Sequence, residues 1–198
     1  SKTDALQVAL FATVFLHELP GWATLLAIAL ATTGVVLLSM PATPSSTGAL
    51  EWTGGAALWG LASGAGFAMS AVGYRGAALA VPEASPWMAG AWGVLCAQAA
   101  QTLLLGGWLA WRSPASLRAI ATAWRVSTAA GLTGALASIG WFTAFALTMA
   151  ANVRTLGLVE VVFSYLVSHR LLREKLAPLE TVGLLLVLAG LLAMFATL

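Results

Sequence analysis

The sequence predicts an all-α, polytopic transmembrane helix bundle, and three observations lead to this fold class. Hydrophobic residues make up 60% of the 198 residues, and charged residues make up only 8%. A soluble domain carries about 25% charged residues because its surface must be hydrated. Long apolar runs follow one another along the chain, and tryptophans gather near their ends. Most of the surface must therefore face other helices or lipid, and the bilayer is the first expected partner.

Seven apolar runs have, or approach, the length of about 20 residues that a membrane-crossing helix needs. They are rich in Leu and Ala and lack the alternation of a strand. Six of the nine tryptophans lie near their ends, where an amphipathic ring favours the headgroup region. Glycines are frequent in the third and fifth runs, and we expect them to permit close helix contacts. The expected spans are residues 5–16, 22–40, 53–74, 87–111, 126–150, 153–168 and 178–198.

Lys and Arg concentrate in two of the expected loops, 112–125 and 169–177. The positive-inside rule places both loops in the cytoplasm. The composition as a whole predicts an integral membrane protein, and we expect a bacterial inner (plasma) membrane as its location.

Several functional classes find no support in the residues. The nine Lys and Arg residues form no basic patch, so nucleic acid is not an expected partner. One cysteine, Cys96, cannot form an intrachain disulfide, and one thiol is no metal site. No paired-carboxylate, HExxH or Gly-rich phosphate signature occurs. We therefore expect no cofactor, no metal and no catalytic cluster.

Two helix–turn–helix segments, residues 16–38 and 172–194, resemble each other at a constant offset of 156 positions. Each reads as a helix, a short turn with Glu and Pro, and a longer helix that contains a glycine. Such self-similarity predicts an internal repeat. The matching positions are Asp4 and Glu160, Glu18 and Glu174, and Gly34 and Gly190.

The repeat divides the chain into three parts. Residues 1–40 are interpreted as the last two helices of a first unit, residues 41–52 as a linker, and residues 53–198 as a complete second unit of five helices. On this count about a hundred residues, with three spans, are expected before Ser1. Units with an odd number of spans run in opposite senses through the membrane, which is the inverted-repeat architecture of many secondary transporters.

Several motifs carry a family resemblance: SKTDALQVALF at 1–11, HELP at 17–20, GVVLLS at 34–39, VRTLGLVEVVFSYLVS at 153–168 and REKL at 173–176. With these motifs the sequence resembles the ten-helix, EamA-type branch of the drug/metabolite transporter superfamily. The resemblance implies a five-plus-five inverted-repeat bundle that moves small metabolites or drugs through a central cavity. Relative to that plan, we expect the chain to be N-terminally truncated.

Glu160 is the strongest candidate for a functional residue. It lies about seven residues into the sixth expected span, among Leu and Val. An acidic group at that depth costs about 2.5–3.5 kcal/mol, so it usually faces a cavity or a partner. Ser164 lies one helical turn away on the same face, which we expect to point into the bundle. We interpret Glu160 as a proton acceptor or a ligand for a cationic substrate group; a structural ion pair with Arg75 or Arg154 is the alternative.

Other polar and aromatic residues are weaker candidates for contact with a small-molecule substrate. Arg75 could bind a substrate carboxylate or extend to the membrane interface, whereas Arg154 is interpreted as an interfacial anchor. The two glutamines of the fourth span could make interhelical hydrogen bonds instead of contacting substrate. The candidates of the fifth span could line a cavity or serve ordinary helix packing. These candidates are Tyr74, Arg75, Gln98, Gln101, Ser138 and Trp141.

The leading functional hypothesis is therefore a secondary transporter that exports or exchanges small organic solutes, with Glu160 in proton coupling or substrate binding. An inactive or partner-dependent truncated membrane protein is a second hypothesis. A membrane-embedded enzyme is a third, but the acidic residues are spread singly and not clustered at one face. A second copy of the chain is a further partner that the sequence permits, in a homo-oligomer.

Overall fold

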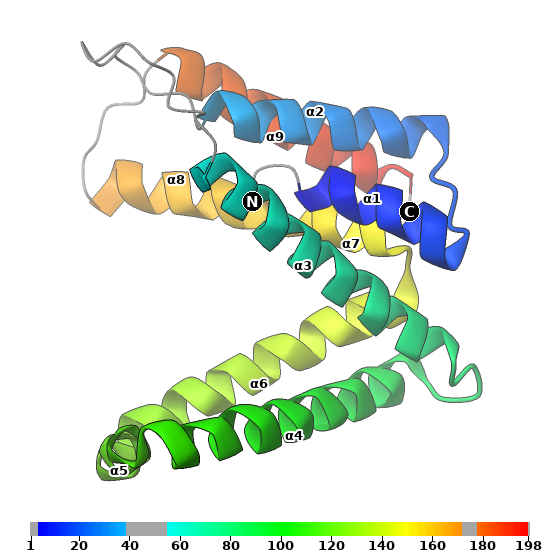
Figure 1. Cartoon of the computed structure of the whole chain (residues 1–198). Helices are drawn as coiled ribbons and strands as arrows, with labels where there is room; N and C mark the ends of the chain where they lie inside the picture. The colour runs from blue at the N-terminus through cyan, green and yellow to red at the C-terminus, as the bar shows by residue number, and fades with distance from the viewer. Residues whose placement is uncertain (1–3, 39–54, 172–177, 198) are drawn as a thin grey trace. The chain divides into compact units, whose positions relative to one another are not determined.

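The computed structural model describes residues 4–38, 55–171 and 178–197. Every regular element in these ranges is a helix, so the all-α prediction is confirmed. The expected linker 41–52 and the turn that contains Glu174 lie outside the described residues. The helices, shown in Figure 1, are α1 (Asp4–Leu16), α2 (Trp22–Leu38), α3 (Gly55–Leu79), α4 (Pro86–Arg112), α5 (Pro114–Thr122), α6 (Trp124–Leu147), α7 (Ala150–Gly157), α8 (Val159–Leu171) and α9 (Pro178–Phe195).

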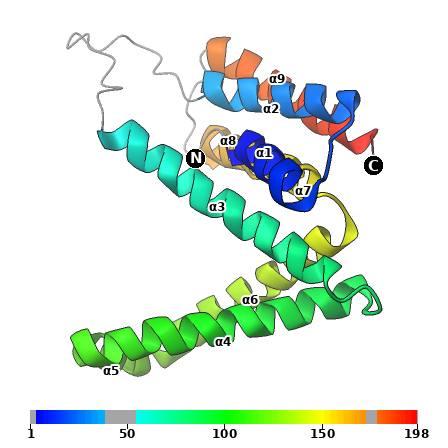
Figure 2. The same ribbon diagram turned by 45° about the vertical axis from the view of Figure 1, so that its right-hand side comes forward.

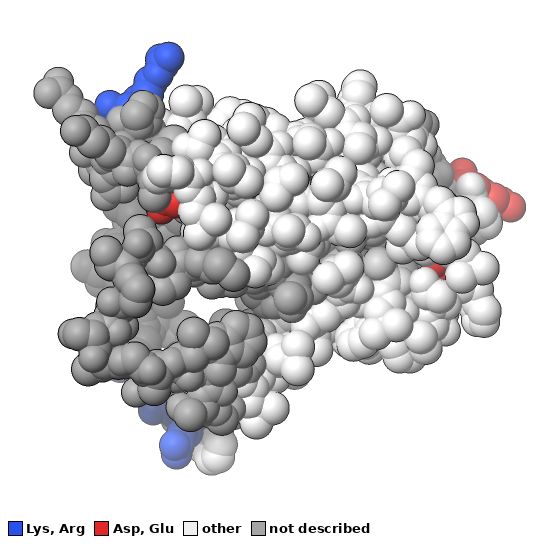
Figure 3. All heavy atoms as spheres, turned by 90° about the horizontal axis from the view of Figure 1, so that it is seen from above, with Lys and Arg blue, Asp and Glu red and all other residues white. Residues whose placement is uncertain are grey.

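The described helices support the prediction of a polytopic membrane protein. Four stretches are long and apolar enough to cross a bilayer: α4, α6, the combined stretch Ala150–Ser168 of α7 and α8, and α9. The apolar helices α1 and α2 are shorter. Figure 3 shows one face on which the charged side chains of the described residues lie toward its two edges, with an uncharged surface between them. This distribution is expected where the middle of each helix contacts lipid.

Two local features differ from the sequence prediction. Residues 112–125, expected as a loop, contain the short helix α5. The sixth expected span is interrupted at Leu158, so that it consists of α7 and α8. At the interruption the Leu158 N–H donates a hydrogen bond to the Thr155 carbonyl at 3.0 Å, which is a tighter turn than that of an α-helix.

The chain forms two compact units, which are described separately. The first unit contains Ser1–Gly73 and Met149–Leu198, and the second contains Tyr74–Thr148. In the first unit α2 and α9 lie side by side, and α1 and α7 pack beneath them (Figures 1 and 2). Ile28, Val187 and Met194 are fully buried between these helices.

Glycines bring α2 and α9 into close contact. A Cβ atom at Gly34 would lie 2.6 Å from the Gly183 carbonyl oxygen, and one at Gly190 would lie 2.6 Å from the Ala31 nitrogen. Real Cβ atoms do not approach backbone atoms this closely, so each of the two positions requires glycine. Small residues are a common means of close helix packing in a bilayer, where lipid offers no hydrophobic drive for association.

The contacts between α2 and α9 are reciprocal. The offset of 156 positions that relates the two segments in the sequence also relates the two sets of contacts. A reciprocal interface of this kind is what a local two-fold axis produces. Gly34 faces Gly183 and Val187, and the corresponding Gly190 faces Ala27 and Ala31.

In the second unit α4 packs against α6, again at glycines. A Cβ atom at Gly90 would lie 2.6 Å from the Thr143 hydroxyl oxygen, and one at Gly93 would lie 2.6 Å from the Phe142 ring. Among the glycines of the third and fifth expected spans, Gly64 is buried, but at six others no atom lies within 4 Å of an added Cβ. The expected close contacts of these glycines are therefore not found in the described structure: Gly60, Gly66, Gly73, Gly131, Gly134 and Gly140.

The packing of α2 against α9 can be tested with Gly34→Ala and Gly190→Ala. We expect each substitution to lower the free energy of unfolding by about 1–3 kcal/mol, because the added methyl group has no space. The measurement is reversible unfolding of the purified chain in detergent. Gly66→Ala is the matched control, since its Cβ would meet open space and the substitution should raise helix stability by up to about 1 kcal/mol. Wild-type stability of both variants would contradict the packing described here.

Candidate functional site

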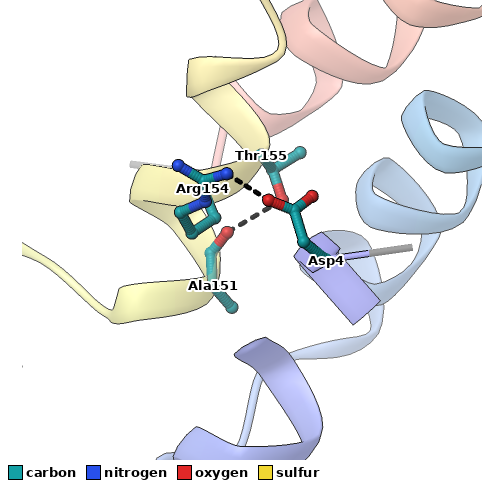
Figure 4. Close-up of polar contacts among 4 residues, drawn as sticks. All are labelled: Asp4, Ala151, Arg154 and Thr155. Atoms are coloured by element: carbon teal, nitrogen blue, oxygen red, sulfur yellow. Dashed lines mark hydrogen bonds and ion pairs between the residues drawn. The ribbon is translucent and has the colours of Figure 1, made fainter. Parts of the chain in front are cut away.

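A buried ion pair joins α1 and α7 in the first unit. The Nη2 atom of Arg154 donates a hydrogen bond to Oδ2 of Asp4, whose residue is only 5% exposed. Figure 4 shows the guanidinium and the carboxylate pointing toward each other across the two helices. Beside them the Thr155 hydroxyl donates to the Ala151 carbonyl at 2.8 Å, so this hydroxyl is satisfied within α7. The ion pair therefore fixes α7 to α1.

This pair corrects the interpretation of Arg154 as an interfacial anchor. Arg154 binds a buried carboxylate, and its side chain is only 23% exposed. Asp4 was noted in the sequence solely as the counterpart of Glu160. Glu160 was selected because a carboxylate among apolar residues is costly. The same cost applies to Asp4, so the same argument could have identified Asp4 as a residue that needs a partner.

Glu18 caps the N-terminus of α7. Its Oε2 atom accepts a hydrogen bond from the Ala150 N–H at 3.2 Å, at a helix end whose own N-cap residue, Met149, provides no side-chain cap. From the sequence alone, a carboxylate in this turn could cap the next helix or pair with Arg173 or Lys175. The capped helix is instead α7, more than a hundred residues further along the chain. The turn is closed by His17, whose φ of 56° lies in the left-handed region.

Glu160 lies in the first turn of α8, two residues after the interruption at Leu158. Its side chain is exposed, and so is that of Ser164. The Ser164 hydroxyl donates to the backbone carbonyl of Glu160 at 2.8 Å, so it serves the helix and not the carboxylate. Within the described part of the chain, no hydrogen bond or ion pair to the Glu160 carboxylate is found. The face of α8 that was expected to point into the bundle is thus not packed within the first unit.

In the second unit, aromatic side chains from α3 and α6 form a cluster. The Tyr74 ring lies 3.9 Å from that of Phe142, measured between centroids, and 6.3 Å from that of Phe145. The Trp141 and Phe145 centroids are 6.2 Å apart, and Phe145 is only 4% exposed. The two distances above 6 Å are typical of attractive aromatic contacts, and the Tyr74 and Phe142 rings lie closer together. Tyr74 and Trp141 therefore contribute to packing in this unit.

Arg75 closes the C-terminal end of α6. Its Nη1 atom donates to the Phe145 carbonyl at 2.9 Å and to the Ala146 carbonyl at 3.1 Å. The last carbonyls of a helix lack partners within the helix, and a cation there also meets the negative end of the helix dipole. Neither interpretation of Arg75 from the sequence included this contact. The partners of this guanidinium in the structure are backbone carbonyls of α6. Substrate binding by Arg75 stays a prediction.

The remaining candidates lie on the exposed faces of α4 and α6. Gln98 and Gln101 are exposed on α4, and Ser138 is partly exposed on α6. The structure thus brings Tyr74, Arg75 and Trp141 together within the second unit. Glu160 and Ser164 lie together on α8 in the first unit.

The apolar spans and the ionisable groups satisfied inside them define a polytopic helical membrane protein. Residues 54–196, well over half of the chain, match the model of the EamA-like transporter family. The chain belongs to this family, which is one of membrane transporters of small molecules and not of enzymes. Neither a curated protein nor a solved structure matches the chain.

A double-mutant cycle tests the ion pair. We expect Asp4→Asn or Arg154→Gln alone to lower the free energy of unfolding by about 3 kcal/mol, because each leaves a poorly solvated charge without its partner. The double variant should be less destabilised than the sum of the two single variants, since the amide groups can bond to each other. Additive effects in equilibrium unfolding would show that the two side chains do not interact.

The cap on α6 predicts a graded response at Arg75. Arg75→Met should lower the free energy of unfolding by about 1–2 kcal/mol through the loss of charge-assisted hydrogen bonds to the carbonyls. Arg75→Lys should recover part of this loss, because an ammonium group also donates to carbonyls and favours a helix C-terminus. Thermal unfolding of the three proteins side by side measures the effect. Equal stability of the Met variant and the wild type would rule out the cap.

Proposed function

We propose that the chain serves secondary transport of small organic solutes, by export or exchange, and that Glu160 is the group that binds a proton or a cationic part of the solute. Membership of the EamA-like family supports the class of membrane transporter. The observation that carries the finer proposal is the place of Glu160. It is an exposed carboxylate near the middle of an apolar stretch, Ala150–Ser168, that is long enough to cross the bilayer.

The energy of placing a carboxylate at this depth supports a functional role. In a purely apolar setting it costs about 2.5–3.5 kcal/mol, so such a residue faces water, a cavity or a partner. Its neighbours Val159 and Phe163 are exposed apolar residues, 42% and 60% respectively. They offer no compensating polar group. A polar compartment that admits protons and solutes would compensate the charge.

The tight turn at Leu158, where α7 passes into α8, also supports the proposal. Secondary transporters bind their substrates and coupling ions at discontinuous helices near the bilayer centre. Here α7 is fixed by the Glu18 cap and by the pair of Asp4 with Arg154, and α8 begins after the break at Leu158. Glu160 lies in the first turn of α8, where the positive end of the helix dipole favours a negative charge.

The proposed architecture is a cavity between two inverted repeats. Residues 1–40 would supply two helices of the first repeat, and residues 53–198 the whole of the second. The equivalent contacts that Gly34 makes with α9 and Gly190 makes with α2 support this assignment. Corresponding helices of two repeats meet in that way across a local two-fold axis. The candidate residues of the second unit remain predicted contacts for the solute.

Glu160→Gln tests the role of the carboxylate. The wild-type chain is reconstituted in proteoliposomes, and movement of protons is followed with an enclosed pH-sensitive dye while amines and amino acids are added one at a time. We expect Glu160→Gln to lower solute-coupled proton movement by roughly a hundredfold, the scale for loss of a positioned proton acceptor. Glu160→Asp should retain part of the activity. Glu180→Gln, in the first turn of α9, is the matched control.

Two outcomes would decide against the proposal. Unchanged coupling in Glu160→Gln would remove Glu160 from the mechanism. A wild-type chain that moves none of the solutes, although it is folded and inserted, would favour the partner-dependent interpretation.

A further inference from the structure

The short helix α5 lies across the end of the hairpin formed by α4 and α6 in the second unit. In Figure 1, α5 is seen end-on, whereas α4 and α6 are seen along their lengths. Both of these helices are long and apolar enough to cross the bilayer, so the ends that α5 joins lie at one membrane surface. A short helix that connects two spans in this way runs along the surface and not through the membrane.

The residues of α5 suit the boundary between lipid tails and headgroups. Leu117, Ile120 and Ala121 share one face by their helical spacing, and Arg118 and Thr122 share another. Ile120 is 50% exposed, although it is apolar. The tryptophans at either side of the helix, Trp111 and Trp124, are 81% and 60% exposed. Exposed aromatic rings at the ends of spans are typical of the headgroup region.

Three arginines lie in or beside α5, and in the described second unit no acidic residue lies near them in the sequence. Arg112 ends α4, Arg118 lies within α5, and Arg125 is in the first turn of α6, and all three are exposed. The sequence contains no Asp or Glu between Glu83 and Glu160. The guanidinium of Arg125 lies 5.5 Å from the centroid of the Trp124 ring, which holds this cation beside an interfacial aromatic residue. We call Arg112, Arg118 and Arg125 the arginine group.

We propose that α5 and the arginine group form a binding site for the headgroups of anionic phospholipids. Guanidinium groups bind phosphate oxygens in a bidentate manner. The positive-inside rule expects this loop at the cytoplasmic surface, where anionic lipids create a negative potential. The exposed apolar residues beside the arginines favour a lipid over a free anion as the ligand. Only a lipid has acyl chains that these residues can contact. The proposal does not depend on which solute the protein transports.

Lipid retention tests the site directly. The purified chain is equilibrated in nanodiscs that contain equal amounts of POPG and POPC, released into detergent, and its retained lipids are counted by native mass spectrometry. We expect the wild type to retain POPG in preference to POPC. Each substitution among Arg112→Gln, Arg118→Gln and Arg125→Gln should lower the ratio of retained POPG to POPC by up to about fivefold, the effect of one arginine near an anionic surface. A triple lysine variant, which keeps the charge but not the bidentate geometry, should retain only part of the preference.

Hydrogen–deuterium exchange identifies where the lipid acts. We expect exchange of the amides of residues 114–122 to be slower in POPG nanodiscs than in POPC nanodiscs for the wild type, and equal in both for the triple glutamine variant. If the triple variant does not fold, Arg118→Gln alone is used, because Arg118 is exposed on α5. Retention of the two lipids in their bulk ratio by the wild type would overturn the proposal. Equal protection of α5 by inorganic phosphate in POPC nanodiscs would also overturn it, since the site would then bind a free anion.

Discussion

The ends of helices are the features of this structure that most need partners. Each helix end leaves backbone N–H or C=O groups without partners inside the helix, and the interior of a membrane offers no water to replace them. Side chains from distant parts of the chain close three such ends. Glu18 accepts from the first N–H of α7, Arg75 donates to the last carbonyls of α6, and the Tyr165 hydroxyl donates to the Leu38 carbonyl of α2 at 2.9 Å. These contacts tie the N-terminus of α7 and the C-terminal ends of α2 and α6 to segments that are remote in sequence.

The sequence predicted the helices well because the bilayer imposes a length and a composition on each of them. The expected spans 22–40 and 87–111 agree with α2 and α4 to within two residues at each end. The break at Leu158 and the helix α5 were not predicted. The stretch Ala150–Ser168 as a whole is apolar enough to cross the bilayer, so its hydropathy does not reveal the break, and the arginines around α5 made its segment resemble a loop. Hydropathy measures how apolar a segment is, and it does not report whether the backbone is continuous or which way a short helix runs.

The candidate site could be predicted in its residue types but not in its partners. Arg75 and Arg154 were both recognised as cations near span ends, where an extended side chain normally reaches the interface. Their true partners are carbonyls of α6 for Arg75 and the carboxylate of Asp4 for Arg154. Each partner lies at least 70 positions away in the sequence, so no local pattern could reveal it. The clustering of Tyr74 with Phe142 is of the same kind, since aromatic spacing along one helix does not show which other helix supplies the second ring.

Asp4 and Glu160 occupy corresponding positions at the offset of 156, but their surroundings differ. Both begin a helix within an apolar segment, so both benefit from the helix dipole and both would be costly to leave in lipid. Asp4 is buried and its charge is balanced by Arg154, so its carboxylate is committed to holding α1 on α7. Glu160 is exposed, and among the described residues no cation balances it. A carboxylate whose charge the fold already neutralises gains little from a proton or a cationic solute, whereas one that the fold leaves exposed can exchange such partners. The difference in their surroundings, and not in their chemistry, is therefore what favours Glu160 as the group that acts in transport.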